Sequence, residues 1–256
     1  NNNVMARVES LIKLNGTIGD LSFYKSKSVG YQARMKTGVS GDRIANDPVF
    51  ARTRENGSEF GRAQQEGKKL RDLLRDVLFE NADNKFSSRL ASRMLKVIQM
   101  DPVSVRGERV LVPQNMVLLN GLECNQRASL KNITLKPLSV SFDNFSGEGF
   151  LTCEQLIPNL HIAKLSGATH VQYTLVLQEF SGDETDQRPV IQRSAYIMLG
   201  DMQPMDLDIA ATIVHDPDKS VMVLVGTGYY QLVNGAYYPL ANGQYNALTI
   251  HQVVIP

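Results

Sequence analysis

The chain of 256 residues contains no tryptophan, few aromatic residues of any kind and no long apolar run. A transmembrane helix needs about 20 consecutive, mostly apolar residues, so we expect no membrane insertion. The first residues, Asn1–Arg7, lack the apolar stretch of a secretory signal. The location is therefore left open between the cytoplasm and a virion, with an extracellular filament as a further option if a leader has been removed.

Cysteine is nearly absent as well, with Cys124 and Cys153 as the only two. Two cysteines cannot build the disulfide framework of a small secreted domain. Both lie in the part of the chain that we predict to be rich in strands. One disulfide between them and two separate buried thiols therefore both fit the sequence.

Motifs of catalysis and metal binding are also missing. The chain has no Gly-x-Ser-x-Gly elbow, no Walker motif and no dinucleotide fingerprint. The segment His215–Asp218 contains residue types that bind metals, but its composition is typical of a turn. Asp201, Asp206 and Asp208 lack the spacing of a calcium loop. We therefore expect no catalytic residue, no metal and no cofactor, and the chain is predicted not to be an enzyme.

What the chain does have is an uneven distribution of charge. Residues 1–107 contain 19 Lys and Arg against 12 Asp and Glu, a net charge of +7, whereas residues 108–256 contain 8 against 14, a net charge of −6. Such asymmetry usually concerns partners and not the fold. It suggests either a basic arm for an acidic ligand or a subunit whose front fits the back of its neighbour.

Three short segments near the N-terminus read as strands with basic residues at intervals: 11–14, 21–25 and 31–36. The first two are separated by Asn15-Gly16 and Gly19-Asp20, which are residue pairs that favour tight turns. A ribbon this small is only marginally stable alone. We therefore expect it to lie on its own chain or on another subunit.

Two helices are expected next. Asp47-Pro48 is a typical helix start, because Asp accepts hydrogen bonds from free backbone N–H groups and Pro suits the first helical position. An apolar stripe extends from there to about Glu80, and a second one extends from Ser87 or Ser88 to Met100. The short connector between the two helices predicts an antiparallel hairpin.

From Val110 onward the pattern changes to short strands separated by turns, with a turn at 144–149 and a clear hairpin turn at Asn234-Gly235. The predicted strands are 110–112, 116–119, 130–135, 138–142, 170–179, 192–199, 206–213, 221–228, 231–232 with 237–238, and 247–255. Many strands of this length predict an antiparallel sandwich. The sequence thus predicts an α+β fold with an N-terminal β-ribbon arm (residues 1–40), a helical hairpin (41–107) and a C-terminal antiparallel β-sandwich (108–256).

Two stretches of the first half carry a family resemblance: Gly16-Thr17-Ile18-Gly19-Asp20-Leu21-Ser22-Phe23-Tyr24-Lys25 continued by Gly30-Tyr31-x-Ala33-Arg34, and Arg43-Ile44-x-x-Asp47-Pro48-x-Phe50-x-Arg52-Thr53-Arg54-Glu55-Asn56-x-Ser58-Glu59-Phe60-Gly61-x-Ala63. Together they resemble the N-terminal signature of an uncharacterised family of Bacteroidota-type and phage-associated proteins, over roughly residues 5–100. The resemblance carries over no catalytic residue. It implies that residues 16–63 form one functional unit, which suits a contact surface better than an active site.

The sequence favours a non-enzymatic structural subunit that assembles with copies of itself into a filament, tube or ring, such as a bacterial appendage or a part of a virion. The basic arm would dock on the acidic β-domain of a neighbour, by surface contact or by adding strands to a sheet edge. Heterologous docking of this kind closes into a ring or extends into a filament. The predicted self-association residues are Leu21, Phe23, Tyr24, Lys25, Tyr31, Arg34, Arg43, Asp47, Phe50, Arg54 and Phe60.

Two other functions stay open. Basic residues interleaved with tyrosines in the first half would follow a nucleic-acid backbone, although acidic residues share the first predicted helix. The β-sandwich would alternatively bind a small ligand or a glycan through stacking tyrosines, which are also simply good strand formers. The tyrosines in question are Tyr229, Tyr230, Tyr237, Tyr238 and Tyr245.

Overall fold

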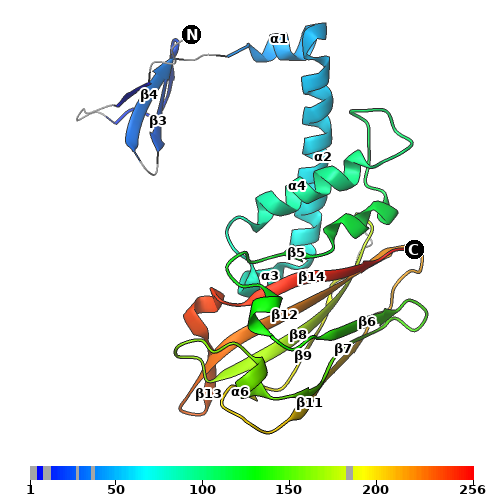
Figure 1. The fold of residues 1–256 in the computed structure, drawn as a ribbon. Coiled ribbons are helices and arrows are strands. Elements are labelled where there is room, and N and C mark those ends of the chain that lie inside the picture. Colours follow the sequence, from blue (N-terminus) through cyan, green and yellow to red (C-terminus); the bar gives the residue numbers. More distant parts are fainter. Residues whose placement is uncertain (1–4, 8–12, 27–28, 36–37, 183–186) are drawn as a thin grey trace. The chain divides into compact units, whose positions relative to one another are not determined.

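The computed structural model describes residues 5–7, 13–26, 29–35, 38–182 and 187–256 (Figure 1). The chain divides into two compact units, unit 1 with residues 1–54 and unit 2 with residues 55–256. The fold is α+β, as predicted, with an N-terminal β-ribbon, a set of helices and C-terminal antiparallel sheets.

Unit 1 contains a four-stranded antiparallel sheet with the strand order β1-β4-β3-β2. The strands are β1 (Met5–Arg7), β2 (Gly16–Ile18), β3 (Leu21–Ser26) and β4 (Gly30–Met35). Gly19 and Asp20 make the turn between β2 and β3, as expected. The strand predicted at 11–14 is displaced along the chain: residues 11 and 12 lie outside the described part, residues 13 and 14 are not in a strand, and β2 begins at Gly16.

The helices of the first half follow the predicted pattern closely. They are α1 (Gly41–Asn46), the 3-10 turn η1 (Pro48–Phe50), α2 (Ala51–Leu73), α3 (Arg75–Asn81) and α4 (Phe86–Gln99). The Asp47 carboxylate accepts a hydrogen bond from the Val49 backbone N–H at 3.0 Å. Asp47 therefore caps the helical start at Pro48, as predicted. The long helix expected to end near Glu80 is divided at Leu74 into α2 and α3.

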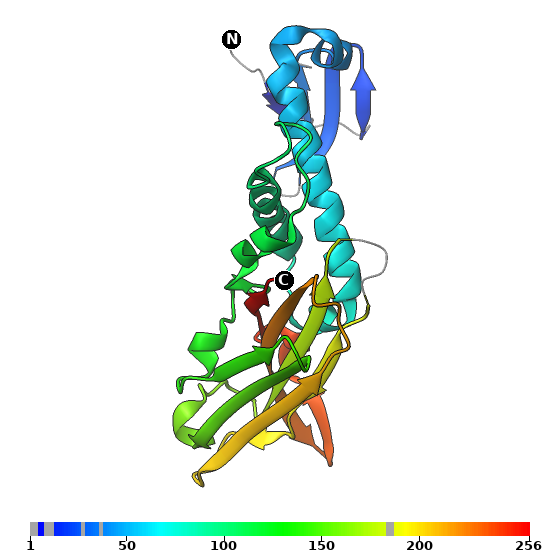
Figure 2. The ribbon, with the colours of Figure 1, turned by 90° about the vertical axis from the view of Figure 1, so that its right-hand side faces the viewer.

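Unit 2 is built around a seven-stranded antiparallel sheet with the order β10-β8-β12-β14-β5, to which β9 and β13 add by pairing with β8 and β12. Helices pack on one face of this sheet, and the three-stranded sheet β11-β7-β6 packs on the other (Figures 1 and 2). The strands are β5 (Leu122–Glu123), β6 (Ser139–Asp143), β7 (Glu148–Leu156), β8 (His170–Phe180), β9 (Val190–Arg193), β10 (Ile197–Met198), β11 (Met205–Thr212), β12 (Ser220–Val233), β13 (Ala236–Pro239) and β14 (Ala247–Val254). Short helical turns connect them: η2 (Pro113–Leu119), α5 (Leu130–Ile133), α6 (Pro158–His161) and η3 (Leu240–Gly243).

Strand β12 shows how the two hydrophobic cores arise. Met222 and Leu224 lie in the core that the helices cover, together with Leu90 of α4. Val223 and Val225 alternate with them and lie in the core between the two sheets. A strand covered on both faces is a continuous apolar run, and burial of each such side chain contributes about 1.5–3 kcal/mol to stability. The helices and the sheets of unit 2 are therefore held together by shared cores.

Four local expectations about the second half are wrong. Residues 110–112, expected as a strand, are in no helix or strand. Residues 116–119, expected as a strand, belong to the 3-10 helix η2, and residues 130–133 form the short helix α5. Conversely, β7 occupies residues 148–156, where the sequence predicted a turn at 144–149 and no strand between 143 and 169. Short apolar runs do not distinguish a strand from a buried helical turn. The Asn234-Gly235 hairpin between β12 and β13 is confirmed, with positive φ at both residues.

Candidate interaction surfaces

One face of the unit 1 sheet gathers four of the predicted self-association residues. Strands β3 and β4 pair residue by residue, from Leu21 opposite Met35 to Lys25 opposite Tyr31, and directly opposite residues share a face. This surface, which we call the apolar face, consists of Ile18, Leu21, Phe23, Lys25, Tyr31, Ala33 and Met35. The side chains of Ile18, Leu21 and Met35 are 61%, 43% and 53% exposed. None of the residues of unit 1 whose burial is described is buried.

The opposite face of the same sheet is polar and carries two more predicted residues, Tyr24 and Arg34. The Arg34 guanidinium lies 5.5 Å from the centroid of the Tyr24 ring, a cation–π distance. Next to this pair, the hydroxyl oxygens of Thr17 and Ser22 are 3.4 Å apart. The sheet is therefore amphipathic, and it separates the predicted arm residues into an apolar and a polar set.

Four predicted residues of the connector form one local cluster before α2. The Arg43 Nε donates to the Asp47 carboxylate at 3.1 Å, and the Arg43 guanidinium lies 5.8 Å from the Phe50 ring centroid. Arg54 Nη1 donates to the carbonyl oxygens of Ile44 at 2.7 Å and of Asp47 at 3.0 Å. The backbone cap hydrogen bond and then the Arg43 hydrogen bond lower the pKa of Asp47. These contacts hold α1 against the start of α2, so this part of the sequence motif has a structural role.

The last predicted residue, Phe60, lies on α2 in unit 2, with 47% of its side chain exposed. Several cations of the same helix have partners within the chain. Arg62 donates to the Gly107 carbonyl oxygen at 2.7 Å, and the Lys69 ammonium pairs with Glu66 at 3.0 Å. Engaged cations of this kind are less available to an external phosphate backbone.

The small sheet of unit 2 presents an acidic outer surface. Its three strands contain no Lys or Arg, and their residues alternate between buried and exposed, as in β11, where Asp206 and Asp208 are exposed and Leu207 and Ile209 are buried. Phe145, in the turn between β6 and β7, is fully exposed. We call this surface the acidic face; its carboxylates are Asp143, Glu148, Glu154, Asp206 and Asp208.

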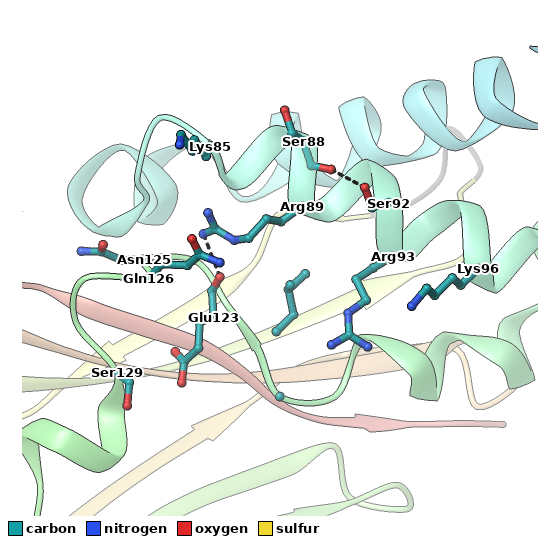
Figure 3. Close-up of a pocket in the computed structure, with 12 residues that line it drawn as sticks. Lys85, Ser88, Arg89, Ser92, Arg93, Lys96, Glu123, Asn125, Gln126 and Ser129 are labelled. Atoms are coloured by element: carbon teal, nitrogen blue, oxygen red, sulfur yellow. Dashed lines mark hydrogen bonds between the residues drawn. The ribbon is translucent and has the colours of Figure 1, made fainter.

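A groove with a volume of about 720 Å³ lies between α4 and the segment 121–129 of unit 2 (Figure 3). We call it the α4 groove, and its cations are Lys85, Arg89, Arg93 and Lys96. Their spacing of four, four and three residues places them along one side of a helix, and α4 itself contains no acidic residue. This spacing is visible in the sequence, so the groove is a candidate site that a search for helical charge periodicity would have found.

Arg89 is fixed at the wall of the α4 groove. Its guanidinium donates to the Asp83 carboxylate at 2.9 Å and to the carbonyl oxygens of Glu123 and Cys124 at 3.0 and 2.9 Å. Burial alone would raise the pKa of Asp83, but the hydrogen bonds from Arg89 and from two backbone N–H groups outweigh it and lower that pKa to about 2. The charge of Arg89 is thus balanced by Asp83.

Tyrosines gather around a second cavity of unit 2, which has a volume of about 790 Å³. Tyr196 stacks on Tyr237 with 3.8 Å between ring centroids, and it meets the Tyr230 ring edge-on at 4.9 Å. Of the five tyrosines considered from the sequence, Tyr230 and Tyr237 line this cavity. Tyr229 is buried instead, and its hydroxyl donates to the Ala163 carbonyl oxygen at 2.6 Å, so it is a core residue.

The two cysteines are free thiols. Cys124 lies in the core under the helices and Cys153 in the core between the sheets, and burial raises the pKa of both thiols. Within the described ranges, no group of three His, Cys, Asp or Glu residues is placed to hold a metal ion. The helices that the structure describes include none that is long and apolar enough to cross a membrane.

Comparison of the chain with family models, with characterised proteins and with solved structures gave no match. The family resemblance over roughly residues 5–100 therefore stays a prediction. The function is inferred from the surfaces described above.

Proposed function

We propose that the protein is a non-enzymatic structural subunit that assembles with copies of itself, by docking the apolar face of unit 1 on the acidic face of a second copy. The observation that carries this proposal is a complete sheet of four strands in which no residue of described burial is buried. Fixing the backbone of one residue costs about 1–2 kcal/mol of conformational entropy. A sheet recovers that cost mainly by burying one face, and a neighbouring copy that covers the apolar face would supply this burial.

Charge favours the acidic face of a neighbouring copy as the surface that covers the apolar face. Unit 1 contains nine Lys and Arg against four Asp and Glu, a net charge of +5, and unit 2 contains 18 against 22, a net charge of −4. Opposite charges steer association and fix its orientation, and like charges brought together oppose it. Pairing two apolar faces with each other would bring both copies of Lys25 together, so a second copy's arm is a poorer partner than its acidic face.

The two surfaces also match in their mixture of side chains. Among its aliphatic and aromatic side chains, the apolar face carries the Lys25 ammonium group, 5.7 Å from the Tyr31 ring centroid, and the Lys13 ammonium group lies 5.8 Å from the same ring. The acidic face carries the exposed Phe145 ring and the half-buried Phe150 ring among carboxylates. Docking would bury apolar surface from both partners and bring Lys25 close to a carboxylate, which is the usual composition of an interface core with a polar rim.

The proposed contact joins two different surfaces, so it is heterologous. A heterologous contact forms a ring if its rotation closes and a filament or tube if it does not. This supports a role as the repeating subunit of an appendage or a virion component. Nucleic-acid binding by the first half is a weaker alternative, because cations of α2 such as Arg62 and Lys69 are engaged within the chain.

A matched pair of variants on β3 tests the proposal. Phe23→Asp places a charge on the apolar face, and Ser22→Asp places the same charge on the polar face of the same strand. We expect the wild type and Ser22→Asp to form assemblies, and Phe23→Asp to be monomeric, when mass is measured by multi-angle light scattering. Lys25→Glu is a second variant that leaves the apolar side chains in place, and it should weaken assembly because it removes the attraction to the acidic face.

Two results would overturn the proposal. One is a wild type that stays monomeric up to about 100 μM, well above the Kd of about 1 μM that corresponds to roughly −8 kcal/mol. The other is an unchanged mass for both Phe23→Asp and Lys25→Glu, which would mean that the apolar face takes no part in assembly.

A further inference from the structure

The α4 groove holds positive charge that the chain does not balance. Arg89 is neutralised by Asp83, but Arg93 has only a 3.5 Å contact with the Leu118 carbonyl oxygen among its described hydrogen bonds. In the described part of the chain, no carboxylate lies within ion-pair distance of Lys85, Arg93 or Lys96. These free cations stand out because unit 2 as a whole is acidic.

The one carboxylate that lines the α4 groove does not offset this charge fully. Glu123 accepts a hydrogen bond from the Thr249 hydroxyl at 2.5 Å, and it is directed away from the Arg89 guanidinium (Figure 3). Burial raises the pKa of Glu123, which disfavours its charged form. The groove therefore has four cations on its α4 side and one carboxylate, hydrogen-bonded to Thr249, on the opposite side.

The other lining groups are neutral and polar. Ser88 and Ser92 lie between the cations on α4, and Gln126 and Ser129 line the opposite side. The side chains of Gln126 and Ser129 make no hydrogen bond within the described part of the chain. Hydroxyl and amide groups beside cations suit a ligand that has both negative groups and hydroxyls.

We propose that the α4 groove binds a glycan that carries sulfate or phosphate esters. Arg93 presents a planar guanidinium that can hold two ester oxygens at once, and Lys96 adds a second positive charge one turn further along α4. Gln126 and Ser129 would bond the sugar hydroxyls. Lys85 to Lys96 spans about 16 Å at 1.5 Å of rise per residue, which is long enough for several sugar rings.

The same groove is a poor nucleic-acid site. Proteins that bind single strands combine cations with aromatic rings on which the bases stack. The residues that line the α4 groove include no aromatic ring. The groove could bind the phosphates of a nucleic acid but offers no aromatic ring on which its bases could stack, so a glycan is the better match.

This inference is separate from the proposed assembly. The assembly uses the apolar face of unit 1 and the acidic face of the small sheet, whereas the groove is formed by α4 and the segment 121–129. If one of these two proposals fails, the other is unaffected, because the variants that test them share no residue.

The test is calorimetric titration of the full chain, at about 50 mM NaCl where screening is weak. The probes are a sulfated hexasaccharide, its unsulfated form, inositol hexakisphosphate and a single-stranded oligonucleotide of comparable charge. The variant is Arg93→Gln with Lys96→Gln. The control is Lys164→Gln with Arg188→Gln, which removes the same charges from exposed positions outside the groove.

We expect an esterified probe to bind the wild type, the groove variant to lose at least about tenfold in affinity, and the control to stay within about twofold. Preference for the sulfated or the phosphorylated probe then identifies the ester. Equal losses in variant and control would overturn the proposal, since they would show binding to net charge alone. Absence of binding by every esterified probe, or tighter binding of the oligonucleotide through the same residues, would overturn it as well.

Discussion

Glu59 is a carboxylate that α2 buries almost completely, with 1% of the residue exposed. One of its oxygens accepts from the Gly107 backbone N–H at 2.9 Å and lies 3.7 Å from the Arg109 guanidinium, and the other accepts from Gln99 at 3.5 Å. A buried carboxylate is tolerated only when donors bond to it. Removing it would leave those donors buried without a hydrogen-bond partner, which costs free energy. Glu59 thus fastens the loop after α4 to α2, and its place in the N-terminal motif has a structural reason.

We predict that Glu59→Ala lowers the free energy of unfolding by about 2–4 kcal/mol, the range for breaking a buried charged network. The control is Asp72→Ala, which removes a carboxylate of the same helix whose ion pair with Arg75 is exposed, and it should cost at most about 1 kcal/mol. Urea unfolding followed by circular dichroism measures both. Equal effects of the two variants would show that the Glu59 contacts add nothing to stability.

At the scale of elements, Asp83 joins the turn between α3 and α4 to the segment after β5. Its carboxylate accepts from the Arg89 guanidinium at 2.9 Å and from the backbone N–H groups of Lys85 and Gln126 at 2.8 and 2.9 Å. These hydrogen bonds favour the charged form and outweigh the effect of burial, so the pKa falls from 3.8 to about 2. The charged carboxylate therefore stabilises the folded chain.

The pH dependence of stability follows from this shift. The folded pKa lies below the unfolded one, so the contribution of Asp83 is complete above about pH 4 and is lost as the pH falls towards 2. We predict that Asp83→Asn is less stable than the wild type at pH 7 and that the difference shrinks between pH 4 and pH 2. Thermal unfolding across this range measures it, with Asp76→Asn, an exposed position on α3, as the control. A difference that is constant with pH would contradict the assigned role.

The elements that the sequence predicts well are those with long or redundant patterns. α4 has an apolar stripe over four turns, and the hairpin at Asn234-Gly235 needs the positive φ that these residues tolerate. β7 was missed because Gly149 stands at an inward position and Phe150 at an outward one, which hides the alternation of a strand. A Cβ at Gly149 would lie 2.7 Å from the Leu177 Cδ2, so a larger residue there would force this buried side chain to shift.

The candidate surfaces were predictable to different extents. The sequence places Leu21, Phe23 and Tyr31 in strands, but which of them share a face depends on the register of β3 against β4, and that register is fixed by turns. The α4 groove needs the segment 121–129 beside α4, a contact between distant parts of the chain. Tyr196 was missed for the same reason, since its stacking on Tyr237 joins two separate segments.

At the scale of the whole molecule, the chain has two surfaces of opposite character, one on each compact unit. The positive unit 1 has an apolar face whose residues of described burial are all at least partly exposed, and the negative unit 2 has an acidic face without a single cation in its strands. In the proposed assembly, two distinct surfaces on one subunit would make every copy both a donor and an acceptor. The roles of the two surfaces can be tested separately by blocking one surface at a time.

We predict that two defective variants restore one contact when they are mixed. Phe23→Asp lacks the arm contact but keeps the acidic face, and Asp208→Lys with Glu148→Lys lacks the acidic face but keeps the arm. Each should be monomeric alone, with a mass near 28.4 kDa. In the mixture, the intact arm of one docks on the intact acidic face of the other, and growth stops there because both remaining surfaces are blocked. Light scattering should therefore show a 1:1 complex. Isologous pairing of two arms or of two acidic faces would give no such complex, so a mixture that stays monomeric would exclude the heterologous contact.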